Sequence, residues 1–295
     1  MSYALIAQWH KKAVSVGRLC RVLGVSRSGY YGWRQRAQRA PQACRVSTQL
    51  KAEFAASGRV YGSRRLGAIL RAQGLRIGRH RVRRLMREHR LRALWRRKFV
   101  HTTDSAHALP VAGNVLARRF NPSGPNQAWV SDITHIRTRS GWLYLAVVLD
   151  LYARKVVGWA MAPTMHAELV GSALQLAIAQ RQPAPGLIVH SDRGSQYASA
   201  LHQALLTRHG LVGSMSRKGN CWDNAVMERF FLSLKTERVW QRDYANHAEA
   251  MTDIADYIVG FYNSVRLHSK LGNLPPNAFE QQSACTQPIA VSEKT

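Results

Sequence analysis

The sequence predicts an α/β fold in which a mixed β-sheet, with helices on its faces, follows a strongly basic and all-helical region. Three observations predict it. Residues 1–120 carry 27 Lys and Arg against three acids, whereas residues 121–295 carry 16 against 13. Helical apolar spacing dominates the first part, and runs of β-branched and apolar residues begin at residue 128. Positive charge confined to one part of a chain is typical of a nucleic-acid-binding region.

Residues 1–99 are predicted to be a DNA-binding region with two helix-turn-helix units. In the first unit, near residues 16–36, Gly24 permits the turn and Ser26 can cap the second helix. The second unit, near residues 61–91, pairs two amphipathic segments around glycines. Most protein–DNA hydrogen bonds go to phosphate and sugar, so arginines on these helices are the expected contacts. The residues expected to contact DNA are Arg27, Arg34, Arg64, Arg65, Arg79, Arg81, Arg83, Arg84 and Arg87.

Residues 100–127 lose this periodicity and hold three prolines, so a linker is expected there. Residues 128–280 form the predicted sheet domain, and residues 281–295 a tail. Strands are expected near 128–138, 142–151, 155–162, 186–191 and 212–215. Helices are expected near 166–181, 198–209, 224–240 and 247–266. The first three strands have short connections and should form an antiparallel meander, whereas a helical crossover leads to the fourth, so the five-stranded sheet is mixed.

The cysteines are scattered, and none lies in a C-x-x-C pair, so no zinc knuckle is predicted. Free thiols in a reducing cytosol are the expectation. No run of about 20 apolar residues occurs, and the first residues lack the apolar stretch of a signal peptide. We therefore expect no membrane partner. The cysteines are Cys20, Cys44, Cys221 and Cys285.

Three acidic residues are placed where a carboxylate needs a partner. Asp132 interrupts a strand, Asp192 follows the end of another, and Glu228 lies on a predicted helix. A buried carboxylate is costly unless Arg, Lys or a divalent cation neutralises it. Mg²⁺ prefers a few carboxylates with water and phosphate oxygens, and two such ions about 3.5–4 Å apart can activate an attacking oxygen and stabilise a leaving one. Lys235 follows Glu228 by seven residues, two helical turns, and therefore points the same way.

The residues around these acids resemble a known family. Asp132 and Asp192 are separated by 59 residues, and Asp192 and Glu228 by 35. The motifs are WVSDITHI, HSDRGSQY, GNCWDNAVMERFFLSLKTE and YNSVRLHSKLGNLPPNAF. Spacing and motifs together resemble the second-frame transposases of the IS-three family of insertion sequences, over nearly the whole chain. That family is similar to retroviral integrases and has a D-D-35-E catalytic core on a ribonuclease H-like fold.

The resemblance implies a role for each of these residues. Asp132, Asp192 and Glu228 would be catalytic and would bind two Mg²⁺ ions, which Mn²⁺ can replace. Lys235 would be a further residue of the catalytic site, directed toward DNA. Retroviral integrases also have an N-terminal His/His/Cys/Cys zinc module, and this chain departs from that pattern. No zinc is therefore expected.

The activity that the resemblance implies is that of a DNA transposase, which cleaves and transfers strands at terminal inverted repeats. The implied partners are the element ends, target DNA, further copies of the chain, and an upstream-frame helix-turn-helix protein or a fusion to it. Such a protein would act in the bacterial cytoplasm, associated with the nucleoid when it is bound to DNA. Two other interpretations stay open: a ribonuclease H-like nuclease that only hydrolyses, and a non-catalytic regulator that binds DNA.

Other polar residues receive structural expectations. Asp150 should occupy a turn or cap, and His190 should be a packed histidine. Asp223 should cap helix 224–240, with DNA contact as the alternative. Four residues of the motif YNSVRLHSKLGNLPPNAF should dock that motif on the sheet domain, with DNA contact again as the alternative. They are Tyr262, Asn263, Arg266 and His268.

Overall fold

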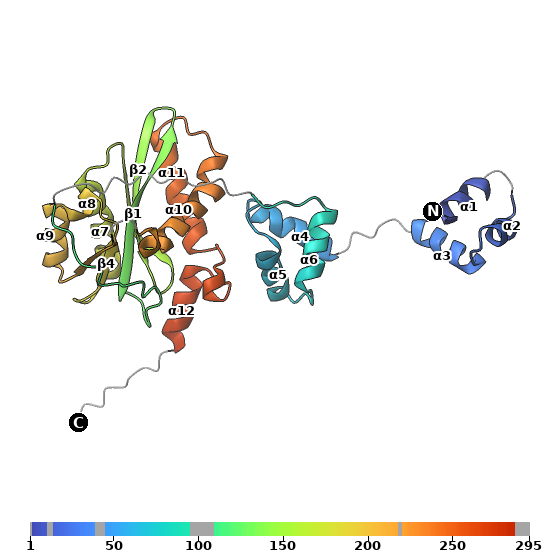
Figure 1. Cartoon of the computed structure of the whole chain (residues 1–295), viewed down its shortest axis with the longest axis horizontal. Coiled ribbons are helices and arrows are strands. Elements are labelled where there is room, and N and C mark those ends of the chain that lie inside the picture. The colour runs from blue at the N-terminus through green and yellow to red at the C-terminus, as the bar shows by residue number, and fades with distance from the viewer. Residues whose placement is uncertain (1, 11–13, 39–44, 95–108, 218–219, 287–295) are drawn as a thin grey trace, which may run out of the picture.

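The computed structural model describes residues 2–10, 14–38, 45–94, 109–217 and 220–286. These residues form three groups of elements (Figure 1): helices α1–α3, helices α4–α6, and a core that contains the sheet. Each group has its own cluster of buried apolar side chains, and the core has one on each face of the sheet.

The first group is a three-helix unit that includes the predicted helix-turn-helix. Its helices are α1 (Ser2–His10), α2 (Val16–Val22) and α3 (Arg27–Gln38). They pack around the buried side chains of Ile6 and Tyr30. Gly24 makes the turn at φ +61°, a conformation that glycine adopts without strain. Ser26 Oγ accepts the Gly29 N–H at 3.0 Å, which is the cap that the sequence predicts.

The second group is also helical and contacts the core. Its helices are α4 (Arg45–Ala56), α5 (Ser63–Ala72) and α6 (Arg79–Glu88). Leu50, Leu66 and Val82 form its buried centre. Leu267 of the core packs against this cluster, and its N–H donates to the Tyr61 hydroxyl at 2.9 Å. Side-chain contacts therefore join the second helical group to the core.

The core is built on a five-stranded sheet. Its strands are β1 (Ala128–Thr138), β2 (Gly141–Asp150), β3 (Lys155–Ala162), β4 (Ile188–Ser191) and β5 (Val212–Met215), in the order β3-β2-β1-β4-β5. β1–β2 and β2–β3 are antiparallel, and β1–β4 and β4–β5 are parallel. Helix α7 (Ala167–Arg181) makes the crossover to β4. The predicted mixed five-stranded sheet of a ribonuclease H-like core is confirmed.

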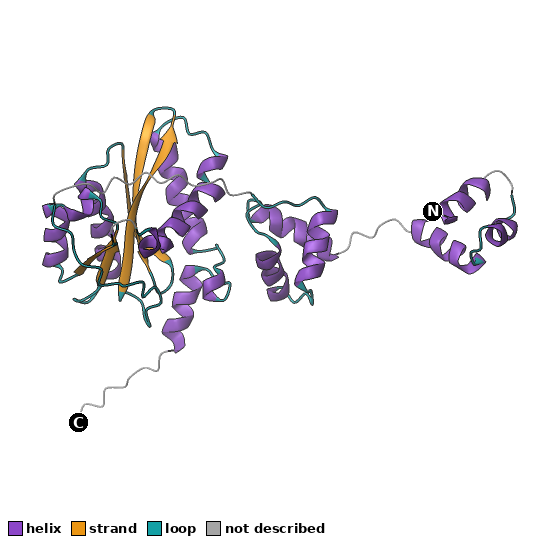
Figure 2. Ribbon diagram, in the orientation of Figure 1, coloured by secondary structure: helices purple, strands orange, loops and turns teal. Residues whose placement is uncertain are grey.

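Helices cover both faces of this sheet (Figure 2). Alternate residues of β2 point to opposite faces of the sheet. Val147 and Leu149 pack in the apolar cluster that includes α10 and α11. Ala146 and Val148 pack in the cluster that includes α7 and α9. The further helices are α8 (Ser195–Ala198), α9 (Ala200–Arg208), α10 (Ala225–Glu237), α11 (His247–Asp256) and α12 (Pro276–Thr286). A π-helical segment, η3 (Tyr257–Asn263), continues α11; the 3-10 turns are Cys221–Asn224, Val239–Gln241 and Ser269–Leu271.

The expected linker differs from the structure over its second part. Residues 109–127 pack on the core, where Leu116 is 1 % exposed and its N–H donates to Ser214 Oγ at 3.1 Å. Side-chain and loop contacts hold this segment, rather than a helix or strand ladder, so periodicity gives no sign of it. Residues 100–108 of the expected linker lie outside the described residues.

The expected boundary at residue 280 falls inside helix α12. Pro276 occupies the first position of that helix, where its fixed φ and missing N–H are tolerated. Residues 287–295 of the expected tail are not among those described. Across the described ranges, no helix has the length and apolarity needed to cross a membrane.

Gly158 of β3 provides a test of the packing between the sheet and α7. A Cβ atom there would lie 2.3 Å from the Ala173 carbonyl oxygen and 2.7 Å from the Ala177 Cβ. We expect Gly158→Ala to destabilise the core by about 1–3 kcal/mol, the usual cost of overpacking, measured by urea unfolding. Gly113→Ala is the control, since its added Cβ meets nothing within 4 Å. Equal unfolding midpoints for both variants would contradict this close approach.

Candidate active site

Strands β1 and β4 bring Asp132 and Asp192 together. The two strands are parallel neighbours, with Val130 of β1 opposite His190 of β4. Two residues further along each chain come Asp132 and Asp192, so the same register places one carboxyl group beside the other. Neighbouring strands lie about 4.8 Å apart. Sheet pairing thus removes the sequence separation of 59 residues between these two acids.

The carboxyl groups act on one another electrostatically. Burial raises the pKa of Asp132 well above its usual range, and the charges of Asp192 and, more weakly, Glu228 raise it further. The Ile133 N–H, which donates to Asp132 Oδ1 at 2.8 Å, and the charge of Lys235 oppose this rise. Asp192 and Glu228, the other two acids that the spacing singles out, therefore both lie within electrostatic reach of Asp132.

Helix α10 carries both Glu228 and Lys235. Lys235 is half-buried, and burial lowers the pKa of its ammonium group while the charge of Asp132 acts in the opposite direction. On β1, burial followed by the charge of Lys235 lowers the pKa of His135. The Lys235 ammonium thus lies close to β1, within electrostatic reach of Asp132 and His135, and is not a solvated surface lysine.

Two residues of the HSDRGSQY motif support the paired aspartates. The Gly194 N–H donates to Asp192 Oδ1 at 2.9 Å. The Tyr197 hydroxyl and Ser131 Oγ share a hydrogen bond of 3.0 Å, one residue before Asp132. Burial, followed by the charges of the two aspartates, holds the pKa of Tyr197 well above its usual range. Sequence reasoning missed Tyr197; its place in the motif, five residues after Asp192, was the available signal.

A divalent cation fits this donor set chemically. Carboxylate oxygens are the ligands that Mg²⁺ prefers. A cation would offset the burial and the repulsion that together raise the pKa of Asp132. Within the described residues, no three His, Cys, Asp or Glu side chains already stand as a metal-binding group. The fold preorganises Asp132 and Asp192 through the strand register, and Glu228 is the acid that would complete the set.

Known proteins share this organisation. Two models described as integrase core domain match residues 122–221 and 209–276, and a model described as HTH-like domain matches residues 41–99. The transposase InsF for insertion sequence IS3A of Escherichia coli (strain K12) is 44 % identical over 289 residues, which cover 96 % of this chain and 99 % of that protein. The chain belongs to the IS3 family of transposases.

Other known proteins are also similar to this chain. The insertion element IS600 uncharacterized 31 kDa protein of Shigella sonnei is 46 % identical over 266 residues, 90 % of this transposase and 98 % of that protein. Among solved structures, the intasome of simian T-cell lymphotropic virus matches with 16 % identity and a TM-score of 0.48, over 82 % of this chain and 76 % of that one. The catalytic core of HTLV-2 integrase with magnesium matches with 17 % identity and a TM-score of 0.41, over 54 % and 98 %.

Asp223 of the transposase does not cap α10, contrary to the expectation. Its side chain is fully buried and accepts the Arg217 N–H at 3.0 Å and the Arg217 guanidinium at 2.9 and 3.0 Å. It also accepts Arg118 Nε at 2.8 Å and Asn114 Nδ2 at 2.9 Å. These donors, led by the Arg217 guanidinium, hold the pKa of Asp223 well below its usual range. The carboxylate therefore ties three segments together and has no surface left for DNA.

The segment of the transposase that follows α11 docks on α10 through a buried ion pair. Arg266 donates through Nε and Nη2 to the two oxygens of Glu237, both at 2.7 Å. The Tyr257 hydroxyl donates to the same carboxylate at 2.7 Å. Asn263 pairs with the backbone N–H and C=O of Val156 at 3.0 and 2.9 Å. The docking role expected for Arg266 and Asn263 is confirmed.

Two other polar residues also take the structural roles expected of them. Asp150 accepts the N–H groups of Asn126 and Tyr152, each at 2.8 Å, and so stabilises the turn after β2. The imidazole of His190 is buried and shares hydrogen bonds with the hydroxyls of Ser214 at 2.9 Å and Ser216 at 3.2 Å. Burial lowers the pKa of His190 to about 4, so it is a neutral, packed side chain.

The arginines expected to contact DNA lie on α3, α5 and α6, and all of them except Arg65 are exposed. Arg65 is half-buried, with its guanidinium 5.2 Å from the centroid of the Tyr61 ring. His80 and four of the α6 arginines line a groove of about 500 Å³ along this helix. The α6 arginines of that groove are Arg81, Arg83, Arg84 and Arg87.

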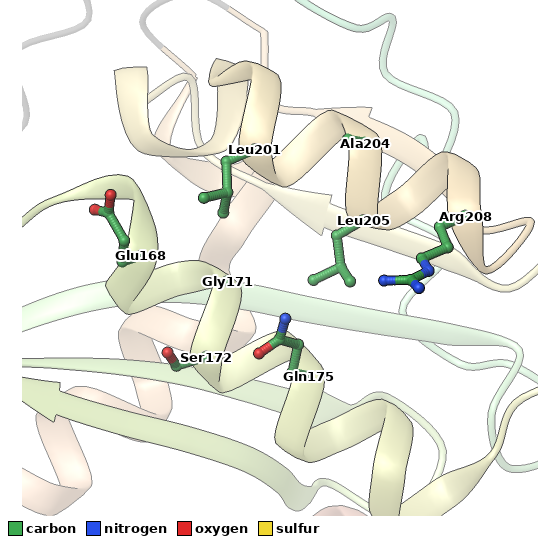
Figure 3. A pocket seen from close by; sticks show the side chains of 8 residues that line it. All are labelled: Glu168, Gly171, Ser172, Gln175, Leu201, Ala204, Leu205 and Arg208. Carbon is green, nitrogen blue, oxygen red and sulfur yellow. The ribbon is translucent and has the colours of Figure 1, made fainter.

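A separate pocket of about 450 Å³ lies between α7 and α9 (Figure 3). Glu168 and Arg208 supply its charged groups, and Leu201 and Leu205 form its apolar wall. Helices α7 and α9 cover the face of the sheet opposite to α10. Because the three acids of the candidate active site do not line this pocket, it is a different feature of the transposase.

The buried ion pair between Arg266 and Glu237, the last residue of α10, gives a stability test. Arg266→Met leaves the Glu237 carboxylate buried without its cation, so we expect a loss of about 3–5 kcal/mol in the free energy of unfolding, measured with urea. The control is Arg139→Met, which breaks the 2.6 Å pair with Asp243 between side chains that are 68 % and 73 % exposed. That variant should unfold like the unsubstituted chain. Equal losses in both variants would be inconsistent with a structural role for the buried pair.

Proposed function

We propose that this transposase cleaves and joins DNA strands at the terminal inverted repeats of its insertion element, with Asp132, Asp192 and Glu228 as its catalytic acids. One observation carries the proposal: the β1–β4 register sets Asp132 beside Asp192, and both Asp192 and Glu228 act on the pKa of Asp132. Two further carboxyl groups within electrostatic reach of a buried aspartate are unfavourable in a structural core. Such carboxyl groups can bind divalent cations at a site where a phosphate reacts.

The three acids would hold two Mg²⁺ ions, or Mn²⁺ in their place. Bound there, the ions would supply activation of the attacking oxygen and stabilisation of the leaving oxygen. The residues of the chain do the positioning. The Gly194 N–H fixes the Asp192 carboxylate, and Lys235 adds a positive charge on the DNA-facing side of the acids.

The proposed reaction has two steps at phosphorus. Water attacks a phosphodiester at the element end, the bond from phosphorus to the 3′-oxygen breaks, and a 3′-hydroxyl is released. That hydroxyl then attacks a second phosphodiester, forming a new ester bond and releasing another 3′-hydroxyl. The usual first product in the family joins one element end to the other on one strand. No covalent bond to the protein is needed at either step.

The two helical groups within residues 1–99 would bind the element ends. The catalytic domain would comprise residues 128–280 together with the packed segment 109–127 and the rest of α12. Two ends must meet for joining, so we propose a homo-multimer on DNA. Target DNA and an upstream-frame helix-turn-helix protein, or a fusion to it, are the further proposed partners. We propose the bacterial cytoplasm, at the nucleoid, as the place of action.

Substitution of the acids tests the catalytic assignment. Asp192→Asn and Glu228→Gln should each lower cleavage and joining of end DNA at least about 10³-fold, because several kcal/mol of transition-state stabilisation depend on the metals. Affinity for the same DNA should stay unchanged. Asp243→Asn, at an exposed carboxylate, is the control and should keep full activity. Unchanged cleavage in the Asp192 and Glu228 variants would refute the assignment.

The products distinguish the two alternative functions. A labelled element end incubated with Mg²⁺ should give both a nicked strand and a joined strand, and chelator should abolish both. Nicking without any joined strand would favour a hydrolytic nuclease. Binding without either product would favour a non-catalytic regulator.

The salt dependence of binding tests the α6 surface. Arg83→Gln combined with Arg87→Gln removes two exposed charges, so the slope of log affinity against log salt should fall in magnitude by about 2, at roughly 0.9 for each phosphate contact. Arg45→Gln with Lys51→Gln, on the exposed surface of α4, is the matched control. A slope that changes equally in both pairs would show that α6 has no special contact.

A further inference from the structure

A cleft of about 530 Å³ lies where the second helical group meets the core. Arg64 and Arg65 of α5 line it from one side, and Ala225, Val226 and Arg229 of α10 from another. The β2–β3 turn contributes Arg154, and the segment between η3 and α12 contributes Arg266 and Lys270. The hydrogen bond between the Leu267 N–H and the Tyr61 hydroxyl joins the two sides. Six cationic side chains therefore surround one space.

Most of this charge has no counter-charge. Arg266 is paired with Glu237, but the other five cations form no ion pair with any acid of the described residues. His268, which also lines the cleft, is neutral: burial, followed by the charges of Arg266, Arg65 and Arg154, lowers its pKa to about 3. The cleft therefore has a strong positive potential.

One nitrogen atom of the Arg154 guanidinium lacks a hydrogen-bond acceptor among the described residues. Its Nη2 donates to the Phe120 carbonyl at 2.7 Å. Its Nη1 is buried, and no atom of the described chain accepts a hydrogen bond from it. A buried donor without an acceptor is unfavourable, and a guanidinium is well suited to phosphate oxygens.

We propose that this cleft binds phosphodiester groups of one DNA strand and so clamps that strand between the second helical group and the helix that carries Glu228. The inference rests on the proposed function, because it takes DNA as the substrate. Two observations favour DNA over another polyanion. Arg64 belongs to the same helical unit as the basic groove of α6, and Arg229 directly follows the catalytic candidate Glu228.

A strand held here would link recognition to chemistry. Phosphates bound by Arg64 would contact the second helical group, and phosphates bound by Arg229 would contact α10, the helix that also carries Glu228. The cleft would then set the distance along the DNA between the sequence that is recognised and the bond that is cut. Positioning of this kind changes rate and cleavage position more than it changes the chemistry itself.

A triple variant tests the clamp. Arg64→Gln, Arg229→Gln and Lys270→Gln remove exposed cations with no ion pair among the described residues, so the fold should persist. The control is Lys51→Gln, Arg137→Gln and Arg208→Gln, which removes the same charge from other exposed positions on the helical group and the core. Both sets are made in the full chain on an Asp192→Asn background, so that binding is measured without cleavage.

The measurement is the affinity for a duplex with the element's own end, by fluorescence anisotropy across a salt series. The slope of log affinity against log salt should fall in magnitude by about 2–3 in the triple variant, at roughly 0.9 for each phosphate contact, and stay constant in the control. An unchanged slope in the triple variant would overturn the proposal. Equal falls in both sets would also overturn it, because they would reflect net charge alone.

Acetylation of lysines, read by mass spectrometry, gives a local second measurement. End DNA should protect Lys270 in the full chain and leave Lys51 reactive. Pyrophosphate at the same phosphate concentration should not protect Lys270; equal protection would mean that the cleft takes a free phosphate compound, and would overturn DNA as its ligand. Failure of the unsubstituted chain to bind any end DNA would instead contradict the proposed function, and the pyrophosphate experiment would still decide whether the cleft binds phosphate.

Discussion

Electrostatic repulsion between carboxyl groups in the centre of the sheet is the constraint on which the rest of the site depends. Burial and the neighbouring charges disfavour ionisation of Asp132, yet the β1–β4 register leaves Asp132 and Asp192 no other place. The backbone hydrogen bonds of the sheet hold Asp132 in β1, and Asp192 directly follows the last residue of β4. A site of this kind is stable only where the surrounding structure is rigid, because relaxation would separate the charges.

That rigidity is concentrated at the two ends of α10. Before the helix, the buried carboxylate of Asp223 gathers donors from Arg217, Arg118 and Asn114. At its last residue, Glu237 receives Arg266 and the Tyr257 hydroxyl. Glu228 and Lys235 lie between these two fixed points. The ion pairs therefore fix both ends of the helix that carries Glu228 and Lys235.

Much of this arrangement could be predicted from local patterns. Alternation and apolar runs locate all five strands. Motif spacing singles out the three acids, two of which, Asp132 and Asp192, the β1–β4 register brings together. The missed features depend on contacts between distant segments. Asp223 resembled a helix cap because its partners Arg118 and Asn114 lie 105 and 109 residues away. Tyr197 was missed because its bond to Ser131 crosses 66 residues.

The partners of Asp223 also bear on where the catalytic domain begins as an independent folding unit. A truncation that starts at β1 would discard Leu116 from the apolar cluster and remove Asn114 and Arg118. Asp223 would keep only Arg217, and the cover over the edge of β5 would be lost. The smallest self-sufficient fragment therefore starts upstream of residue 112, since Ala112 already packs on the core, and a hybrid protein that exchanges DNA-binding regions should place its junction before that point.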